Sequence, residues 1–200
     1  MGAGKDAISV SDNAHDVTVQ WSIFAEGTPQ DPITCPSCNS KGGLIKYDTT
    51  RVTVHHNLFI NEIDRQPLCA WWDTATANPP EAVCDVRNNL IWGYTWGTNI
   101  RAYGTANVVN NYYYSSNPVS ALEVNVNEGG VAYATGNYYQ SGPNMDVKSN
   151  RATPFAAPAL TQTDAITAAH QIVAKAGARG TAFGLDAIDL ARILVVTPVQ

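Results

Sequence analysis

The side chains of this chain that are most capable of chemistry gather in one stretch, VTVHHNLFINEIDRQP, at residues 52–67. Two adjacent histidines, His55 and His56, are followed by a lone arginine, Arg65, beside a proline. A guanidinium is charged at every working pH, so it acts as a base only where other cations crowd it; otherwise it stabilises developing negative charge. The stretch therefore predicts chemistry on an anionic group, unless Arg65 is an ordinary surface arginine that follows a turn.

The first half of this stretch alternates like a β-strand, and four other segments repeat its pattern of a strand, a polar residue and two apolar residues. The polar positions are Ser22, Asn57, Asn89, Asn111 and Asn137, spaced 22 to 35 residues apart. An irregular repeat of short β segments is typical of a solenoid with loops of varying length. We therefore expect a parallel β-helix whose asparagines form an internal ladder and adopt left-handed φ at the bends, with hairpin turns of a β-sandwich as the alternative.

The C-terminal region, residues 151–200, differs from the coils expected over residues 1–150. TPFAAPAL is a Pro/Ala-rich wrap without periodicity, and TQTDAITAAHQIVAKAGARG begins with a capping pattern and predicts a helix. That helix has Ile166, Ala169, His170 and Val173 on one face. We expect it to pack on the solenoid with His170 partly buried, together with a second short helix at LDAIDLARILV.

Composition limits the class of function. The chain is 44% hydrophobic and only 14% charged, which indicates a folded protein with a polar, weakly charged surface. A formal charge of −5 disfavours nucleic acid as a partner, and no apolar run approaches the roughly 18 residues of a membrane span. The first ten residues lack the apolar core of a signal peptide. The four cysteines predict at least one disulfide, with reduced cysteines or a metal at the CPSC of residues 35–38 as alternatives.

The combination of HHN with a spaced R-x-P resembles the pectate lyases of the first polysaccharide-lyase family, in particular a bacterial subgroup. In that family a strand runs VT-hydrophobic-HHN and ends in R-x-P. The segments VTVQWSIFAEG, SKGGLI, VRNNLIWGY and VVNNYYYSS are similar to other coils of the family, and the C-terminal region is similar to the ending of the subgroup. The resemblance covers nearly the whole chain, as a member truncated on its N-terminal side.

The resemblance implies a secreted, right-handed parallel β-helix that cleaves polygalacturonate by calcium-assisted β-elimination. Arg65 matches the arginine that abstracts the C5 proton, and Lys41 matches a lysine that contacts a substrate carboxylate. Ca²⁺ on the uronate carboxylate makes that proton more acidic. The residues we expect to bind substrate are His55, His56, Arg101 and Trp71.

The chain also departs from the family pattern. Ala70 stands where family members often carry a second substrate-binding arginine, five positions after the first. At the acidic positions of the preceding coil only Asp6 is a credible calcium ligand, because Ser9 occupies the other. One carboxylate holds Ca²⁺ weakly, so we expect binding that depends on the substrate. The early coils of the family are absent, and we expect the open N-terminal end of the solenoid to form a homo-oligomer.

Two other functions compete with the lyase. The first is a non-catalytic β-helix that binds acidic polysaccharide, because the catalytic machinery is depleted. The second is a polysaccharide hydrolase on the same scaffold, which requires clustered aspartates on successive coils. Its candidates are Asp64, Asp73 and Asp85, although no DD or NTD motif accompanies them.

Overall fold

A computed structural model describes residues 6–25, 27, 40–72, 77–79, 81–140 and 150–177 of the chain. Its strands form three sheets of five strands each. Sheet A contains β1 (Asp6–Val10), β4 (Lys41–Ile45), β7 (Leu68–Ala70), β10 (Trp96–Arg101) and β13 (Ser120–Val124). Sheet B contains β2 (His15–Gln20), β5 (Thr50–His55), β8 (Cys84–Arg87), β11 (Thr105–Val109) and β14 (Val131–Thr135). Sheet C contains β3 (Ile23–Ala25), β6 (Leu58–Ile60), β9 (Leu90–Trp92), β12 (Tyr112–Tyr114) and β15 (Tyr138–Tyr139). A 3-10 helix, η1 (Val126–Glu128), and an α-helix, α1 (Ala165–Lys175), complete the described elements.

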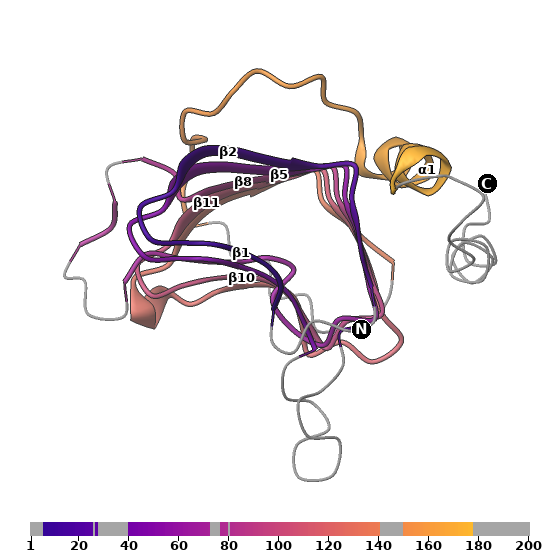
Figure 1. Cartoon of the computed structure of the whole chain (residues 1–200), viewed down its shortest axis with the longest axis horizontal. Helices are drawn as coiled ribbons and strands as arrows, with labels where there is room; N and C mark the ends of the chain where they lie inside the picture. The colour runs from indigo at the N-terminus through magenta and orange to yellow at the C-terminus, as the bar shows by residue number, and fades with distance from the viewer. Residues whose placement is uncertain are drawn as a thin grey trace, which may run out of the picture.

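The sheets are the walls of a parallel β-helix. Every strand pair among the described residues is parallel and joins strands three apart in sequence order, so three strands make one coil. Viewed along the stack, the coils enclose a three-walled cross-section (Figure 1). Parallel pairing excludes the antiparallel β-sandwich, because hairpins join neighbouring strands in opposite directions. The expected solenoid is therefore confirmed.

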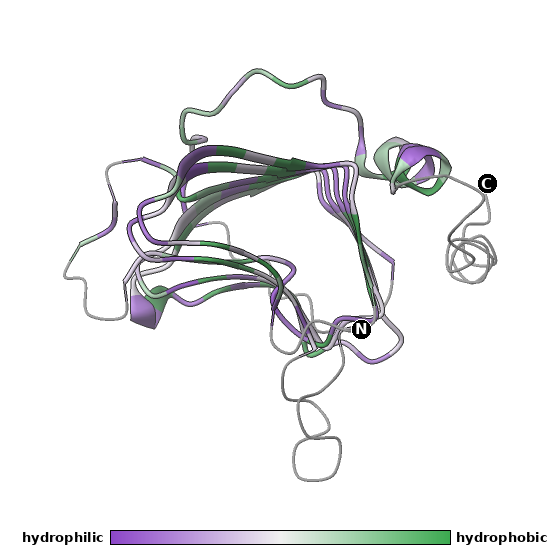
Figure 2. Cartoon of the chain, viewed as in Figure 1, coloured by the Kyte–Doolittle hydropathy of each residue, from purple (hydrophilic) through white to green (hydrophobic). Residues whose placement is uncertain are grey.

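The core fills the space between the walls because alternate residues of each strand point inward. Val52 and Val54 of β5 stack beside Val86 of β8 and Val108 of β11, and all four are at most 3% exposed. Apolar residues lie along the walls, whereas many turns at the left of the view are hydrophilic (Figure 2).

The asparagine ladder runs through the turns between sheets B and C. Asn57, Asn89 and Asn111 each donate a backbone N–H and a side-chain amide N–H to the side-chain oxygen of the next rung, over 2.9–3.1 Å. Asn137 is the last rung, and the backbone N–H of Ser22 donates to Asn57 at 3.0 Å. The ladder is thus confirmed. Each amide forms hydrogen bonds both with buried backbone groups at the turns and with the neighbouring asparagine.

The left-handed residue of each of these turns is not the rung but the residue before it. Positive φ values occur at Trp21, His56, Asn88, Asn110 and Gly136, and they range from 49° to 65°. The expectation that the rungs themselves adopt left-handed φ was wrong. Asparagine and glycine tolerate this conformation best, which explains why NN and GN recur in the sequence.

The described part of the C-terminal region, residues 150–177, crosses the outer face of sheet B and reaches sheet C. In Figure 1 the segment before α1 arches over β2, β5, β8 and β11. The side chain of Asn107 forms two hydrogen bonds of 2.8 and 3.1 Å with the backbone of Phe155. These bonds hold the segment against β11. Polar side chains on the outside of sheet B, such as Thr53 and Asp85, are consequently buried.

Helix α1 begins at an N-cap, Asp164, whose carboxylate accepts hydrogen bonds from the N–H groups of two first-turn residues. Its buried residues are Ala165, Ala168, Ala169 and Ile172. They cover the apolar outer face of sheet C, which explains why strands such as β6 are buried on both faces. Ile166 and His170 are exposed, so the expected buried face was misplaced by part of a turn.

Cys69 of β7 and Cys84 of β8 form a disulfide that links sheets A and B in the core. Cys35, Cys38 and the helix expected at LDAIDLARILV lie outside the described residues. Among the described helices, none has the length and apolarity needed to cross a membrane.

Candidate functional site

The candidate site lies where the strands of sheet A begin, at the corner between sheets C and A. Asp6 of β1 is the register partner of Lys41 in β4, and Lys41 is bridged in turn to Asp64 of the next coil. Arg65 follows directly on Asp64. Three consecutive coils therefore bring two acids and two cations to one corner, although they are far apart in sequence.

The backbone at Arg65 is held closely against β4. The N–H groups of Gly42 and Gly43 donate to the carbonyl oxygens of Asp64 and Arg65 at 3.0 and 2.6 Å. A Cβ atom on Gly42 would lie 2.7 Å from the Arg65 carbonyl oxygen and 2.8 Å from the Phe59 ring, so only glycine permits this approach. Arg65 also has a positive φ of 63°, which directs its side chain away from the line of the strand.

The guanidinium of Arg65 lies between two carboxylates. Its Nη1 donates to Asp6 Oδ1 at 2.8 Å, and its Nε is 4.0 Å from Asp64 Oδ2. Asp64 Oδ1 also accepts a hydrogen bond from the Arg65 backbone N–H at 2.7 Å and one from the Asn99 side chain at 3.1 Å. The side chains of Arg65 and Asp6 are 21% and 5% exposed, so the pair is partly shielded and stronger than a surface ion pair.

The sequence prediction named three of the four charged residues at this corner: Asp6, Lys41 and Arg65. It considered Asp64 only for a hydrolase and did not consider Asn99. The position of Asp64 immediately before Arg65 was an available signal, because neighbouring residues at a bend share a corner. Nothing in the sequence marked Asn99, which reaches Asp64 from the next coil.

The two histidines lie at a different corner, between sheets B and C, where α1 packs. His55 and His56 are 6% and 7% exposed, and their Nδ1 atoms are 2.9 Å apart. His56 stacks on Trp21 with ring centroids 4.5 Å apart. Burial lowers the pKa of His55 and lowers that of His56 to about 4, where the nearby His55 and Lys175 act in the same direction. This placement favours a structural role over the expected role in substrate binding.

Arg101 and Trp71 lie at the opposite end of sheet A from Arg65. Arg101 ends β10, is exposed, and is the register partner of Ala70. Its Nε is 3.6 Å from Glu128 Oε2. The ring of Trp71 packs against the core, so a role in binding substrate is not favoured for it, whereas the adjacent Trp72 is 37% exposed. The exposed tryptophan of this pair was thus missed.

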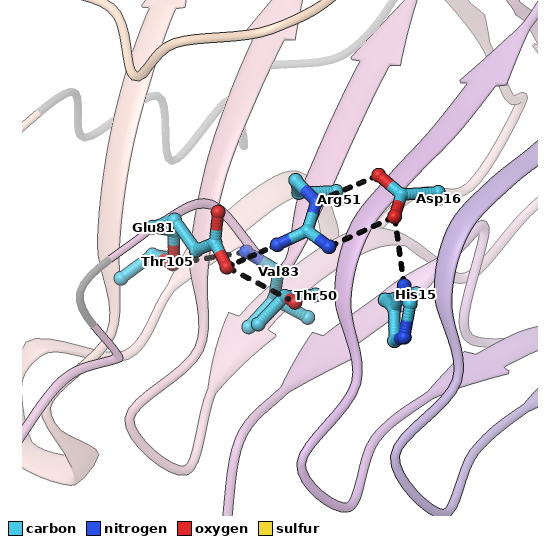
Figure 3. Close-up of polar contacts among 7 residues, drawn as sticks. All are labelled: His15, Asp16, Thr50, Arg51, Glu81, Val83 and Thr105. Carbon is cyan, nitrogen blue, oxygen red and sulfur yellow. Dashed lines mark hydrogen bonds and ion pairs between the residues drawn. The ribbon is translucent and has the colours of Figure 1, made fainter.

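A second charged cluster lies at the corner between sheets A and B (Figure 3). Arg51 binds both carboxylate oxygens of Asp16 at 2.7 and 2.8 Å and also pairs with Glu81, while His15 Nδ1 lies 2.7 Å from Asp16. The Arg51 and His15 hydrogen bonds hold the pKa of Asp16 well below its ordinary value. The network ties neighbouring coils together, and we assign it a structural role.

The corner at Arg65 can bind oxygen anions and a hard cation. Asp6 and Asp64 supply carboxylate oxygens of the kind that Ca²⁺ prefers. Within the described part of the chain, no group of three or more His, Cys, Asp or Glu residues could hold a metal. Two carboxylates would supply only part of a calcium coordination shell.

The chain matches no protein-family model, and no curated protein matches it by sequence.

Proposed function

We propose that this β-helix is a pectate-lyase-like enzyme that cleaves polygalacturonate by calcium-assisted β-elimination. The observation that carries the proposal is the position of Arg65 between the carboxylates of Asp6 and Asp64, beside the strand that begins at Lys41. Cations and acids on adjacent coils provide partners for both the carboxylate of a uronate and a bridging metal ion. The resemblance of HHN and R-x-P to the family motif supports the same reaction.

In this reaction a proton leaves C5 of the uronate and the C4–O bond to the leaving sugar breaks. A double bond then joins C4 and C5, and the leaving oxygen takes up a proton. The slow part is the build-up of charge on the enolate of a carboxylate. Arg65 pairs with carboxylates and not with cations, which supports a role in stabilising that enolate more than a role as the base.

A calcium ion fits this corner if the protein and the substrate both supply its ligands. Held by Asp6 and Asp64 together with the uronate carboxylate, Ca²⁺ would withdraw charge and make the C5 proton more acidic. Arg65 occupies both acids in the free protein, so its guanidinium must turn away from them when substrate and cation arrive. Lys41 would then be a second cation for the substrate carboxylates.

The disulfide between Cys69 and Cys84 supports action in an oxidising compartment. Polygalacturonate is an extracellular polymer, so secretion of the protein agrees with the proposed substrate.

The test of this proposal is the ultraviolet absorbance of the unsaturated product formed from polygalacturonate, with Ca²⁺ and with EDTA. Arg65→Lys keeps a charge but loses the planar fork, so we expect turnover to fall by about a hundredfold or more. Arg151→Lys is the matched control, because Arg151 lies on the wrap over Phe155. Equal turnover in wild type and Arg65→Lys would remove Arg65 from the mechanism.

A non-catalytic, polysaccharide-binding β-helix is the second candidate, and the incomplete set of carboxylates at Arg65 favours it. Such a protein would bind polygalacturonate without releasing product. The hydrolase receives no support, because Asp85 is buried in sheet B, away from Asp64, and Asp73 lies outside the described residues. A hydrolase would release reducing ends without the ultraviolet absorbance, so the same assay separates all three functions.

A further inference from the structure

The far end of sheet A carries an exposed tryptophan and a half-buried tyrosine that the site at Arg65 does not use. The turns after β4 and β7 stack on each other through a hydrogen bond of 3.1 Å from the Tyr47 N–H to the Trp71 carbonyl oxygen. The rings of Tyr47 and Trp72 lie with centroids 4.9 Å apart at 57°. Trp72 is 37% exposed, so part of this ring pair faces solvent without serving the core.

Two cations flank the same surface. Lys46 Nζ lies 4.8 Å from the centroid of the Tyr47 ring. Arg101 lies on the coil beyond Ala70, and its side chain is 47% exposed. Its pairing with Glu128 is long and solvent-exposed, so it contributes little and can be exchanged for another carboxylate.

Sheet A joins this surface to the corner at Arg65. Leu68 and Ala70 of β7 form a cluster with Ala102 and Leu44 on sheet A, separate from the main core. Arg65 and Trp72 are seven positions apart in sequence, so at most roughly 25 Å separates their backbones. The proposed site at Arg65 and the aromatic, cationic surface therefore lie at opposite ends of sheet A, and Leu68, Ala70 and Ala102 between them are buried.

We propose that Tyr47, Trp72, Lys46 and Arg101 form a distal sugar-binding platform for the same uronate polymer. A pyranose ring presents C–H groups on its face, which pack on aromatic rings, and its carboxylate binds the cations at the edge. A neutral sugar would leave the two cations unused. A nucleic acid is disfavoured by the net charge of −5. The identity of the polymer rests on the proposed function, whereas the platform itself does not.

Calorimetric titration with long polygalacturonate in EDTA, which blocks calcium-dependent binding and turnover at the Arg65 corner, tests the platform. We expect Trp72→Ala and Tyr47→Ala each to weaken binding of the polymer by roughly tenfold. Tyr138→Ala is the matched control, because Tyr138 is also exposed and stacked on another tyrosine, Tyr112, but lies on sheet C. Arg101→Gln should weaken binding of the polymer most at low salt.

Unchanged affinity for the long polymer in Trp72→Ala and Tyr47→Ala, or an equal loss in Tyr138→Ala, would overturn the platform. Melting temperatures identify any variant that is misfolded, and Arg101→Gln then decides the outcome, since an exposed side chain can be changed without disturbing the core. The lyase assay separates the two proposals. Turnover with no effect of Trp72 removes the platform alone, whereas binding that depends on Trp72 without turnover removes the enzyme alone.

Discussion

Asp6 is the residue on which the behaviour of Arg65 depends. Its carboxylate is almost fully buried and forms the shortest contact of the guanidinium with a carboxylate among the described residues. The same oxygens are ligands in the proposed calcium complex, so in that proposal Asp6 would pair either with Arg65 or with the metal ion at a given moment. These two roles have different kinetic signatures.

If Asp6 holds calcium in the productive complex, Asp6→Asn should raise the Ca²⁺ concentration needed for half-maximal lyase activity by at least roughly tenfold. Asp16→Asn provides the control, because Asp16 also pairs with an arginine but lies at another corner. A lower turnover with an unchanged calcium requirement would show that Asp6 only positions Arg65.

His56 makes stability depend on pH. Its pKa is 6.5 in an ordinary setting and about 4 in the fold, because burial disfavours the charged ring. Between these values the unfolded chain binds more protons than the folded one, so the free energy of unfolding falls as pH decreases from 6.5 to 4. The loss reaches about 3 kcal/mol at most.

His56→Asn removes this titration while keeping a residue type that tolerates positive φ. Denaturant unfolding between pH 7 and pH 4 should therefore give a smaller slope of stability against pH in the variant than in wild type. Identical slopes would indicate that the His56 ring is solvated and free to become charged.

The pairing of Arg65 with Asp6 shows why residue-level prediction from sequence was incomplete. The two residues are 59 positions apart, and their approach depends on loop lengths that have no periodicity. His55 and His56 were assigned to substrate binding because they belong to the same motif as Arg65. The motif turns a corner between them and Arg65, and the wrap and α1 that cover them carry no signal of where they pack.

At the scale of elements, the ladder is the feature that the sequence predicted best. A polar residue recurring after each strand has few explanations other than stacked turns, and parallel coils supply the register that makes the stacking regular. The bounds of individual strands are harder to predict than the ladder. Each wall strand is short, and the turns between them differ in length and residue type.

Asn89→Leu should destabilise the fold by roughly 1–3 kcal/mol or more, because several buried groups lose their partner. The Asn57 backbone and side-chain N–H groups both donate to Asn89, and Asn89 itself donates to the Val54 carbonyl oxygen at 2.8 Å. Asn137→Leu, at the end of the ladder, should cost less, because its oxygen is only partly buried. Equal melting temperatures for wild type and Asn89→Leu would show that the hydrogen bonds of this rung do not stabilise the fold.

At the scale of the whole molecule, the C-terminal region joins coils that do not otherwise touch. Helix α1 packs on β9 and β12, and the cluster it completes includes Leu58 of β6 and Ile23 of β3. The N–H of Gly177 donates to the Trp21 carbonyl oxygen at 2.8 Å, so the segment after α1 reaches the turn before β3. A solenoid usually gains stability only between neighbouring coils, and this segment adds a connection across them.

Ile172→Ala tests this connection. The Ile172 side chain is fully buried against sheet C, so its truncation should cost about 2–5 kcal/mol and lower the temperature of the whole unfolding transition. Ile166→Ala in the same helix is the control, since Ile166 is 44% exposed and should change stability little. Loss of helical signal alone, with the β-sheet transition unmoved, would show that α1 is an independent appendage.

The contact between Gly177 and Trp21 has a consequence for biosynthesis. About 150 residues separate Ile23 from Gly177, so a ribosome working at roughly 5–20 residues per second takes about 10–30 s to make them. Throughout that interval the outward apolar side chains of β3 are uncovered, and those of β6 and β9 are uncovered from the time that each strand is made. The nascent chain is most exposed to aggregation just before α1 is made, and a chaperone that protects it would have to hold the outer face of sheet C.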